Sequence, residues 1–546
     1  MSAPGRHGDT AWRRQRYLSV AGLLGSSALA VIAGACQWSR LVGSGAAPVL
    51  VLAAVVAVPV LYRLLSSPAG FGSSDRPSGH WSAAGRAAAG LSKGRAGSGG
   101  MQARWATAAD VAPLRVAAAE RGRLVLGKVG RELLACEPNQ SLVVVGPSQT
   151  MKTSGLAIPT ILEWDGPVLA ASVKSDLLRS TFGWRATLGT VSVFDPTGST
   201  GYETADWCPL GGAHSWPAAR RIAATMCQSA RVGEGRLDEA DFWYSLAAKL
   251  LAPLLLAAAR GGLGMEDVAR WVDTQEMGEA YELLRAAGSD EALQAAQASW
   301  GREERQRSSV YTTAETVLES FADRPPAPAS RSVDIGQLLA GGSDTLYLCA
   351  PAHDQSRLRP LFSSLIEEVL RRAYSAATRS GAPLARPLLV VLDEAANIAP
   401  LADLDTLAAT AAGHGIQLLT VFQDLAQVAA RYGVRAATVF NNHRAKLILS
   451  GVSDQVTLDQ VSMLAGEADV MSSSRSRDAR GGFSTTVSPV SRRLAPPDMI
   501  RRIRPGHALL VYGHLPPVEL RLRPYFADPG LRARVGGSAP GQCATA

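Results

Sequence analysis

The sequence predicts an α/β fold: a doubly wound, mainly parallel sheet with an inserted all-α domain, preceded by an N-terminal two-helix transmembrane hairpin. Three observations support this prediction. Apolar runs typical of buried strands alternate with helical stretches between residues 142 and 512. The strand signal is missing between residues 209 and 331, where helical stretches follow one another. Two long apolar stretches without charged residues lie before residue 65.

The apolar stretches are residues 18–35 and 46–62. As helices they are about 27 and 25 Å long, which is enough to cross a bilayer core. Basic residues flank the pair on its outer sides: Arg13, Arg14, Arg16 and Arg63. Only Arg40 lies between the two stretches, so both chain ends are expected on the cytoplasmic side of the cell membrane. An alternative is a secretory signal that ends at Cys36.

The net charge of +8 comes from the N-terminal part of the chain. Residues 1–100 hold ten arginines and lysines against two aspartates, which accounts for the whole excess. The charge therefore reflects membrane topology and is no argument for a DNA-binding face. Residues 66–100 are rich in Gly, Ser, Ala and Arg, which predicts a flexible basic linker. The six cysteines form no CxxC pair, so we expect a reduced cytoplasmic body without structural zinc.

Residues 141–155, SLVVVGPSQTMKTSG, place a buried strand before a turn and an apolar helix. This order is typical of a phosphate-binding loop, whose backbone N–H groups wrap an anion. Lys152 is expected to reach the β- and γ-phosphates of ATP, and the Thr153 hydroxyl to ligate Mg²⁺. Met151 stands where the loop usually has Gly, and a left-handed backbone there costs about 1 kcal/mol. The predicted nucleotide-binding residues are Gly146, Pro147, Ser148, Gln149, Thr150, Met151, Lys152 and Thr153.

A second motif, PLLVVLDEAAN at residues 387–397, ends a buried apolar run in two carboxylates. Buried carboxylates are costly unless they meet a cation. We therefore expect Asp393 to complete the Mg²⁺ site and Glu394 to polarise the attacking water. The alternative is a helix N-terminus with Asp393 as its cap and Glu394 in its first turn.

Further strands are expected from similar apolar runs. They span residues 168–173, 191–194, 345–349, 388–392, 416–422, 446–450 and 508–512. Polar residues follow two of these strands, at Asp195 and at Gln423 with Asp424. Since the carboxyl ends of such strands face the ligand crevice, Gln423 is expected to sense the γ-phosphate, or else to cap a strand-helix junction.

Helical stretches are predicted at residues 218–229, 241–260, 277–287 and 308–321. The apolar part of the second stretch is only about 21 Å long and contains Lys249 and Pro253, so we expect a buried helix there. Residues 472–489 are expected to form a solvated loop, with DNA phosphate contact through its arginines as the alternative. The expected boundaries are 1–65 for the hairpin, 66–100 for the linker, 101–208 and 332–530 for the sheet domain, 209–331 for the all-α domain and 531–546 for a disordered tail.

Several sequence blocks, in this order of domains, resemble the type IV coupling proteins, the conjugative DNA-transfer ATPases of the TraG/TraD kind. The resemblance covers nearly all of residues 104–528. The blocks are VVGPSQTMKTSGLAIP at 144–159, SVKSDLL at 172–178, VFDPTG at 193–198, LDEAANI at 392–398, VFQDLAQVAARYG at 421–433, FNNHRAKLILSGVSD at 440–454 and LLVYGHLPPVEL at 509–520.

The resemblance implies a RecA-like P-loop NTPase domain and a homo-hexameric ring that uses ATP and Mg²⁺. Its cargo would be single-stranded DNA with a bound relaxase, or a protein substrate, delivered to a type IV secretion channel. By position in the family motifs, Lys152 and Thr153 would bind phosphate and Mg²⁺, Asp393 and Glu394 would be the metal and water residues, and Gln423 the γ-phosphate sensor.

One arginine that many relatives carry is missing from residues 410–414, TAAGH, before the Gln-bearing strand. If the enzyme turns over, another arginine is expected to act on the nucleotide of a neighbouring subunit. We expect Arg444 in this role, with Arg431 as the second candidate. Alternatively, Arg444 pairs with a local carboxylate such as Asp424.

Two other functions remain open from the sequence. Met151 and the missing arginine favour a membrane docking scaffold that kept the fold and lost hydrolysis, whereas the Asp393-Glu394 pair opposes it. A chromosome-segregation translocase would share the motor. Such translocases usually carry more membrane spans and a C-terminal winged helix, and neither is predicted here.

Overall fold

The computed structural model describes residues 102–231, 237–322, 331–477 and 483–536. The predicted transmembrane hairpin, the linker and the alternative signal site at Cys36 lie outside the described residues. The fold below therefore concerns the chain from residue 102 onward.

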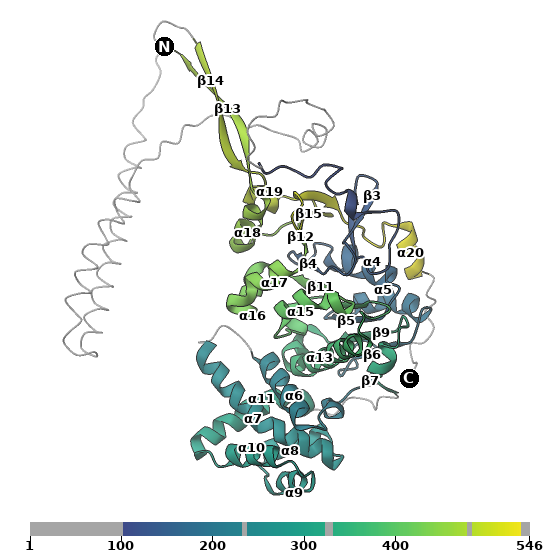
Figure 1. The fold of residues 1–546 in the computed structure, drawn as a ribbon, viewed down its shortest axis with the longest axis vertical. Coiled ribbons are helices and arrows are strands. Elements are labelled where there is room, and N and C mark those ends of the chain that lie inside the picture. Colours follow the sequence, from purple (N-terminus) through teal and green to yellow (C-terminus); the bar gives the residue numbers. More distant parts are fainter. Residues whose placement is uncertain (1–101, 232–236, 323–330, 478–482, 537–546) are drawn as a thin grey trace, which may run out of the picture. The chain divides into compact units, whose positions relative to one another are not determined.

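A twelve-stranded sheet forms the centre of this part of the chain (Figure 1). Its parallel strands are, in spatial order, β12 (Ala445–Leu449), β4 (Leu142–Val145), β11 (Ile416–Phe422), β10 (Leu388–Leu392), β5 (Val168–Ser172), β9 (Thr345–Cys349) and β6 (Val191–Phe194). Antiparallel strands extend the sheet beyond β12 in the order β15 (His507–Tyr512), β16 (Val518–Arg521), β2 (Val125–Val129), β3 (Glu132–Ala135) and β1 (Arg115–Val116). The sheet is therefore mixed and mainly parallel.

Helices cover both faces of the sheet and connect its strands. They are α4 (Ile158–Glu163), α5 (Ser175–Ala186), α12 (Ile335–Leu338), α13 (Gln355–Ser380), α14 (Ala395–Ile398), α15 (Leu404–Thr410), α16 (Leu425–Tyr432), α17 (Ala436–Asn442), α18 (Gln455–Ala465), α19 (Pro497–Arg501) and α20 (Pro529–Gly536). Short helical turns are η1 (Ala112–Leu114), the π-helical η2 (Thr153–Ala157), η4 (Ala352–Asp354), η5 (Ala411–His414) and η6 (Gly433–Arg435).

Strand β4 shows how the sheet is buried on both faces. Leu142 and Val144 belong to the core that α4 and α5 cover, whereas Val143 and Val145 belong to the core under α13. This division follows from the alternation of side chains along a strand. All four residues are buried, as expected for a central strand of a parallel sheet.

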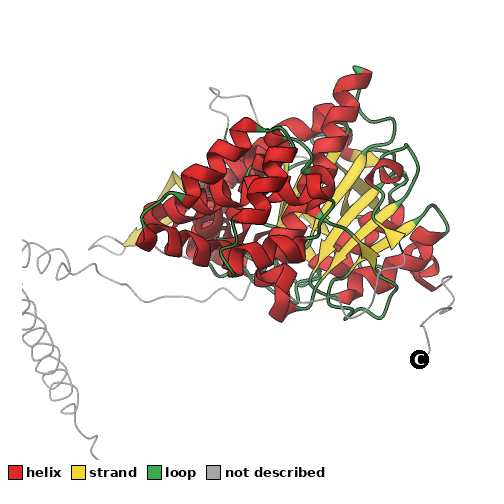
Figure 2. Cartoon of the chain, turned by 90° about the horizontal axis from the view of Figure 1, so that it is seen from below, coloured by secondary structure: helices red, strands yellow, loops and turns green. Residues whose placement is uncertain are grey.

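A separate group of helices is inserted between β7 (Ala205–Asp206) and β8 (Arg331–Ser332), which pair with each other (Figure 2). The group comprises η3 (Pro209–Gly212), α6 (Trp216–Ala230), α7 (Leu237–Gly261), α8 (Met265–Asp273), α9 (Gly278–Ala286), α10 (Asp290–Trp300) and α11 (Glu304–Ala322). These helices share their own hydrophobic core. Residues 241–261 of α7 are long and apolar enough to cross a membrane, but 67% of an 18-residue apolar window within them is buried, which confirms the prediction of a buried helix.

The strands predicted from apolar runs are confirmed, with ends that agree within one residue. Strands β1, β2, β3 and β16 were not predicted, because these short antiparallel strands mix apolar with polar residues.

The solvated loop predicted for residues 472–489 is wrong: β13 (Glu467–Arg477) and β14 (Phe483–Arg493) form a hairpin there. The disordered tail is wrong for residues 531–536, because Leu531 of α20 packs on Ile158 and Leu162.

Candidate nucleotide-binding site

The two motif strands end at the same edge of the sheet. Strand β11 lies between β4 and β10, with Phe422 opposite Val145 and Thr420 opposite Leu392. The residues that follow these three strands are the phosphate-binding loop, Gln423, and Asp393 with Glu394. This edge is where an open α/β sheet binds ligands.

One hydrogen bond joins the loop to the second motif across 240 residues of sequence. The Thr153 hydroxyl donates to Asp393 Oδ2 at 2.9 Å, and the Ser172 hydroxyl lies 3.3 Å from the same oxygen. Asp393 is only 5% exposed. Burial raises the pKa of its carboxyl, and the hydrogen bond from Thr153 opposes the rise. Asp393 does not act as the helix cap of the alternative interpretation, since the residue before α14 is Glu394.

Lys152 is buried and turned back onto its own loop. Its Nζ donates to the carbonyl oxygens of Gly146 at 2.5 Å and Pro147 at 3.1 Å. Burial lowers the pKa of the Lys152 amine, and the charges of Asp393 and Glu394 oppose this. An ammonium held by two carbonyl oxygens can exchange them for the more strongly accepting oxygens of a phosphate.

The loop backbone contains two left-handed residues that are not glycine, Gln149 at φ 64° and Met151 at φ 66°. Such residues cost about 1 kcal/mol or more each. The Met151 side chain packs against the core on the α4 face, with its sulfur close to Gly506. Gly146 is required for a different reason: a Cβ there would lie 2.8 Å from Leu449 Cβ of the neighbouring strand.

Glu394 also has a left-handed backbone, at φ 70°. Its Oε2 lies 3.4 Å from Asn397 Nδ2, and the Asn397 carbonyl accepts a 2.7 Å hydrogen bond from Arg359 Nε. Gln427 links Asn397 to the strand that ends before Gln423: its Nε2 lies 3.5 Å from Asn397 Oδ1, and its Oε1 accepts from the backbone N–H of Gln423 at 3.1 Å. Backbone strain of this kind is typical of functional sites.

Four residues of this network were not predicted from the sequence: Ser172, Arg359, Asn397 and Gln427. Ser172 and Asn397 lie in blocks with a family resemblance, SVKSDLL and LDEAANI, which is the signal that was available. Gln427 also lies in such a block, VFQDLAQVAARYG, whereas Arg359 lies on a helix outside all of them. Their roles depend on helix orientation, which one sequence does not specify.

Among the described contacts, the remaining predicted residues form no hydrogen bond with Lys152, Thr153 or Asp393. Asp195 accepts hydrogen bonds from Thr197 and Thr200 of its own turn, and Asp424 caps α16 by accepting from the Gln427 backbone N–H. Arg444 precedes β12, at the opposite edge of the sheet from the loop, since Ala445 lies opposite Leu142.

Arg444 forms an ion pair with Glu137, at 2.7 Å between Nε and Oε2, and lies over the Tyr512 ring. Its carboxylate partner is thus Glu137, not the suggested Asp424. The second candidate, Arg431, donates to the carbonyl oxygens of Arg231 and Gln228, at 3.0 and 3.1 Å.

The residues at the edge fit ATP with Mg²⁺. A buried carboxylate whose pKa is raised, bonded to a hydroxyl, supplies two oxygen ligands of the kind that Mg²⁺ prefers. The buried ammonium of Lys152 and the backbone N–H groups that precede η2 can hold phosphate oxygens. Asp393 and Thr153 would hold the metal, and residues 146–153 the phosphates.

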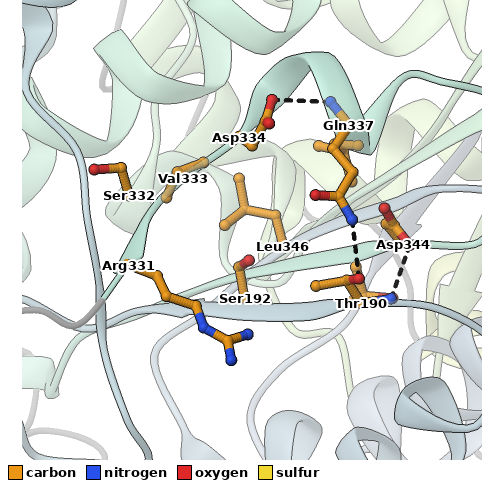
Figure 3. Close-up of a pocket in the computed structure, with 11 residues that line it drawn as sticks. Thr190, Ser192, Arg331, Ser332, Val333, Asp334, Gln337, Asp344 and Leu346 are labelled. Carbon is orange, nitrogen blue, oxygen red and sulfur yellow. Dashed lines mark hydrogen bonds between the residues drawn. The ribbon is translucent and has the colours of Figure 1, made fainter.

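Two cavities lie elsewhere in the described chain. One, of about 100 Å³, lies where β6 and β9 begin, and the hydrogen bonds that link Gln337, Thr190 and Asp344 cross it (Figure 3). The other, of about 610 Å³, lies among α6, α7 and α10 of the inserted helices. Neither is lined by a residue of the predicted nucleotide site.

Comparisons with known proteins agree with this geometry. The family described as "Type IV secretory system Conjugative DNA transfer" matches residues 108–541. The chain is 25% identical over 446 residues to the conjugal transfer protein TraG of Escherichia coli, covering 73% of this chain and 69% of TraG. It is 23% identical over 413 residues to VirD4 of Rhizobium radiobacter, covering 73% of this chain and 59% of VirD4.

Among solved structures, the plasmid coupling protein TrwB in complex with ADP and Mg²⁺ superimposes with a TM-score of 0.59 and 20% identity, over 79% of this chain and 97% of that chain. TrwB with a non-hydrolysable ATP analogue gives a TM-score of 0.58 and 20% identity, over 77% and 93%. These likenesses show the same α/β fold, a mainly parallel mixed sheet with helices. The family match covers most of the chain, so the chain belongs to the conjugative DNA-transfer coupling proteins of type IV secretion.

Proposed function

We propose that this coupling protein is a membrane-anchored ATPase motor. It recruits single-stranded DNA with its relaxase, or a protein substrate, and uses ATP hydrolysis to drive the cargo into the type IV secretion channel. The observation that carries the ATPase proposal is the 2.9 Å hydrogen bond between Thr153 and Asp393. It brings the hydroxyl and the carboxylate of two distant motifs to one point, beside the buried Lys152.

In the proposed mechanism each residue has a separate task. The backbone of residues 146–153 and the Lys152 ammonium hold and orient the phosphates. When bound, Mg²⁺ would neutralise developing charge on the phosphate oxygens, held by Thr153 and Asp393. Glu394 accepts a hydrogen bond from the attacking water and thereby orients it. The backbone N–H of Gln423 donates to Gln427, which holds Gln423 in place at the end of β11. From this position the Gln423 side chain would form a hydrogen bond with the γ-phosphate when ATP is bound.

The partners follow from the family and from the sequence. TrwB has been solved with ADP and Mg²⁺, which supports the same ligands for this chain. Two N-terminal apolar stretches would anchor it in the cell membrane, with both chain ends in the cytoplasm. As a homo-hexamer it would place an arginine of one subunit, with Arg444 as the first choice, near the nucleotide of the next.

Hydrolysis by the purified full chain, with and without single-stranded DNA, tests the proposal. Lys152→Ala is expected to abolish nucleotide binding. Glu394→Gln is expected to keep binding and to lower hydrolysis by about 10²-fold or more, because it loses the group that orients the water. Asp195→Asn, outside the cluster, is the control. ATP binding by Lys152→Ala would contradict the loop assignment.

One observation favours a second candidate, the non-hydrolysing docking scaffold. Two non-glycine residues, Gln149 and Met151, hold strained conformations in the phosphate-binding loop. A wild-type chain that binds ATP but does not hydrolyse it with DNA present would support the scaffold.

A further inference from the structure

In the part of the chain that the structure describes, the hairpin formed by β13 and β14 has no third strand (Figure 1). Its eleven residue pairs run from Glu467 opposite Arg493 to Arg477 opposite Phe483, and nearly all of these residues are exposed. An isolated two-stranded hairpin is only marginally stable in water. A surface that covers one of its faces would therefore stabilise it.

Exposed apolar side chains concentrate on this hairpin and on the helix before it. Eight of the twelve large hydrophobic residues that are exposed in the described chain lie between residues 456 and 490. They are Val456, Met463, Leu464, Val470, Met471, Phe483, Val487 and Val490. Exposed apolar side chains that gather on neighbouring elements point to a site of interaction.

The two faces of the hairpin differ in chemistry. Directly opposite residues and every second residue along a strand share a face. One face, here called the arginine face, carries Met471, Arg475, Arg477, Phe483 and Val487. The guanidinium carbons of its two arginines lie 4.3 and 5.4 Å from the centroid of the Phe483 ring.

The opposite face, here called the hydroxyl face, carries serine and threonine along most of its length. Its hydroxyl residues are Ser472, Ser474, Ser476, Ser484, Thr486 and Ser488. Toward the tip of the hairpin the two faces therefore differ, with Arg475, Arg477 and Phe483 on one side and only serine and threonine on the other. Nearer the base this contrast is lost, because the hydroxyl face also carries Val470, Val490 and Arg492, and the arginine face also carries Glu467 and Asp469. The two arginines near the tip favour an anionic partner.

The base of the hairpin is attached to the point where the described chain begins. The Ala103 backbone N–H donates to the Glu467 carbonyl oxygen at 3.1 Å, and Gln102 Nε2 donates to Asp469 Oδ2 at 2.5 Å. The chain before residue 102 consists of the basic linker and the two predicted membrane spans. The base of the hairpin therefore contacts residues 102 and 103, which directly follow the linker to the proposed membrane anchor.

We propose that the arginine face docks on the anionic phospholipid surface of the membrane that holds this chain. The inference rests on the membrane anchor of the proposed function. The phenyl ring and the aliphatic side chains enter the headgroup region, while Arg475 and Arg477 bind lipid phosphates. The hydroxyl face remains in water. The hairpin lies on the membrane and does not cross it, because both of its edges carry unpaired backbone groups that hydrocarbon cannot satisfy.

A photoreactive side chain tests this docking in the full chain, reconstituted into nanodiscs of phosphatidylglycerol and phosphatidylcholine in equal parts. p-Benzoylphenylalanine is placed at Phe483 or Thr485 of the arginine face, or at Thr486 of the hydroxyl face. After irradiation, mass spectrometry identifies the adducts. Lipid adducts are expected from the first two positions and not from Thr486, the adjacent residue on the other face. Val434, which is apolar and 98% exposed on η6, provides a second negative control.

The charge dependence is tested with Arg475→Ser and Arg477→Ser combined with the probe at Phe483. Each arginine near an anionic surface contributes about 1 kcal/mol, so the double substitution is expected to lower the lipid adduct yield by about tenfold or more. Discs of phosphatidylcholine alone are expected to give a similar loss.

Other outcomes overturn the proposal. Adducts between two copies of the chain would assign the arginine face to a subunit interface, and a disc-bound chain without lipid adducts would refute the docking alone. A chain that does not copurify with the discs would refute the proposed anchor and, with it, the docking.

Discussion

At the scale of single residues, the site holds two buried charges that have no direct ion pair with each other among the described contacts. Lys152 donates to loop carbonyls, and Asp393 accepts from two hydroxyls. Burial shifts the pKa of each toward its neutral form. The two buried charges therefore lower the stability of the nucleotide-free protein. Bound phosphate and Mg²⁺ would offset this cost by pairing with Lys152 and Asp393.

Asp393→Asn is expected to stabilise the nucleotide-free protein by about 1 to 2 kcal/mol. Because the pKa of Asp393 is raised on folding, its contribution to stability is present at low pH and is lost as the pH rises through the folded value. The amide carries no charge and can still accept from Thr153. Thermal unfolding at neutral pH measures the change.

The same substitution should abolish the further stabilisation by ATP that depends on Mg²⁺. Asp195→Asn is the matched control, because the Asp195 carboxylate is also buried but accepts hydrogen bonds within its own turn. A lower unfolding temperature for Asp393→Asn without nucleotide would contradict the argument.

His443 provides a prediction for the pH dependence of stability. It is fully buried, its Nδ1 donates to the Val439 carbonyl oxygen and its Nε2 accepts from Thr420. Burial lowers the pKa of His443 to about 4. Since the unfolded chain binds the proton near its ordinary pKa of 6.5, stability is lost as the pH falls from about 6.5 toward 4, by about 2 kcal/mol between pH 7 and pH 5.

His443→Gln should remove most of this pH-dependent loss, even though it lowers the stability at pH 7. Urea unfolding of the full chain in detergent at the two pH values measures the difference. His214→Gln, at an exposed position, is the control. An unchanged loss in His443→Gln would assign the acid sensitivity to other groups.

At the scale of elements, helix α16 connects the nucleotide edge to the inserted helices. It begins directly after Gln423 and Asp424, and near its end Arg431 donates to the carbonyl oxygens of Gln228 in α6 and of Arg231, the residue after α6. Its guanidinium also lies 3.4 Å from the Pro400 carbonyl oxygen. A displacement of Gln423 by the γ-phosphate would therefore be transmitted to α6 through a single rigid helix.

Arg431→Gln is expected to lower the stimulation of hydrolysis by DNA, by about threefold or more, and to leave nucleotide affinity unchanged. The reason is that α16 and α6 lose their shared hydrogen bonds while the phosphate-binding loop is untouched. Hydrolysis rates with and without single-stranded DNA provide the measurement. Arg435→Gln is the matched control, because the guanidinium of Arg435 pairs with Asp403 and Asp405, which do not belong to α6. A loss of about 10³-fold in the basal rate would instead identify Arg431 as the residue that acts on a neighbour's nucleotide.

At the scale of the whole molecule, the phosphate-binding loop and the proposed arginine, Arg444, lie at opposite edges of the sheet. In one subunit they are therefore too far apart to act on the same nucleotide. Arg444 and Glu137 are 38% and 39% exposed, and an exposed ion pair of this kind contributes only about 0.2 to 1 kcal/mol. Arg444 can therefore leave Glu137 at little cost when another subunit approaches.

Co-assembly of two variants tests this arrangement in the proposed hexamer. Arg444→Ala and Lys152→Ala subunits, each inactive alone, are expected to regain part of the activity when they are co-assembled. Some interfaces then combine an intact Lys152 with an intact Arg444 of the next subunit. Glu137→Gln, which removes only the local partner of Arg444, should retain hydrolysis. Wild-type hydrolysis by Arg444→Ala alone would exclude the role.

Much of the central sheet could be predicted from the sequence, because strands buried on both faces leave continuous apolar runs such as residues 388–392. The phosphate-binding loop and the carboxylate pair were found for the same reason, since polar residues directly follow those runs. The β13–β14 hairpin could not be predicted in this way: most of its residues are serine, threonine or arginine, and exposed strands have no apolar alternation. The contacts of Arg359 and Arg444 depend on long-range packing.

The pairing of β7 with β8 places the two ends of the helical insertion side by side, with Asp206 opposite Ser332. Neighbouring strands are only about 5 Å apart, so a very short peptide could bridge the gap at small entropic cost. The insertion has its own core, which a transplant would carry with it. The insertion is therefore expected to be exchangeable as a unit at this junction, so that a chimera with another helical insertion would keep the fold of the sheet.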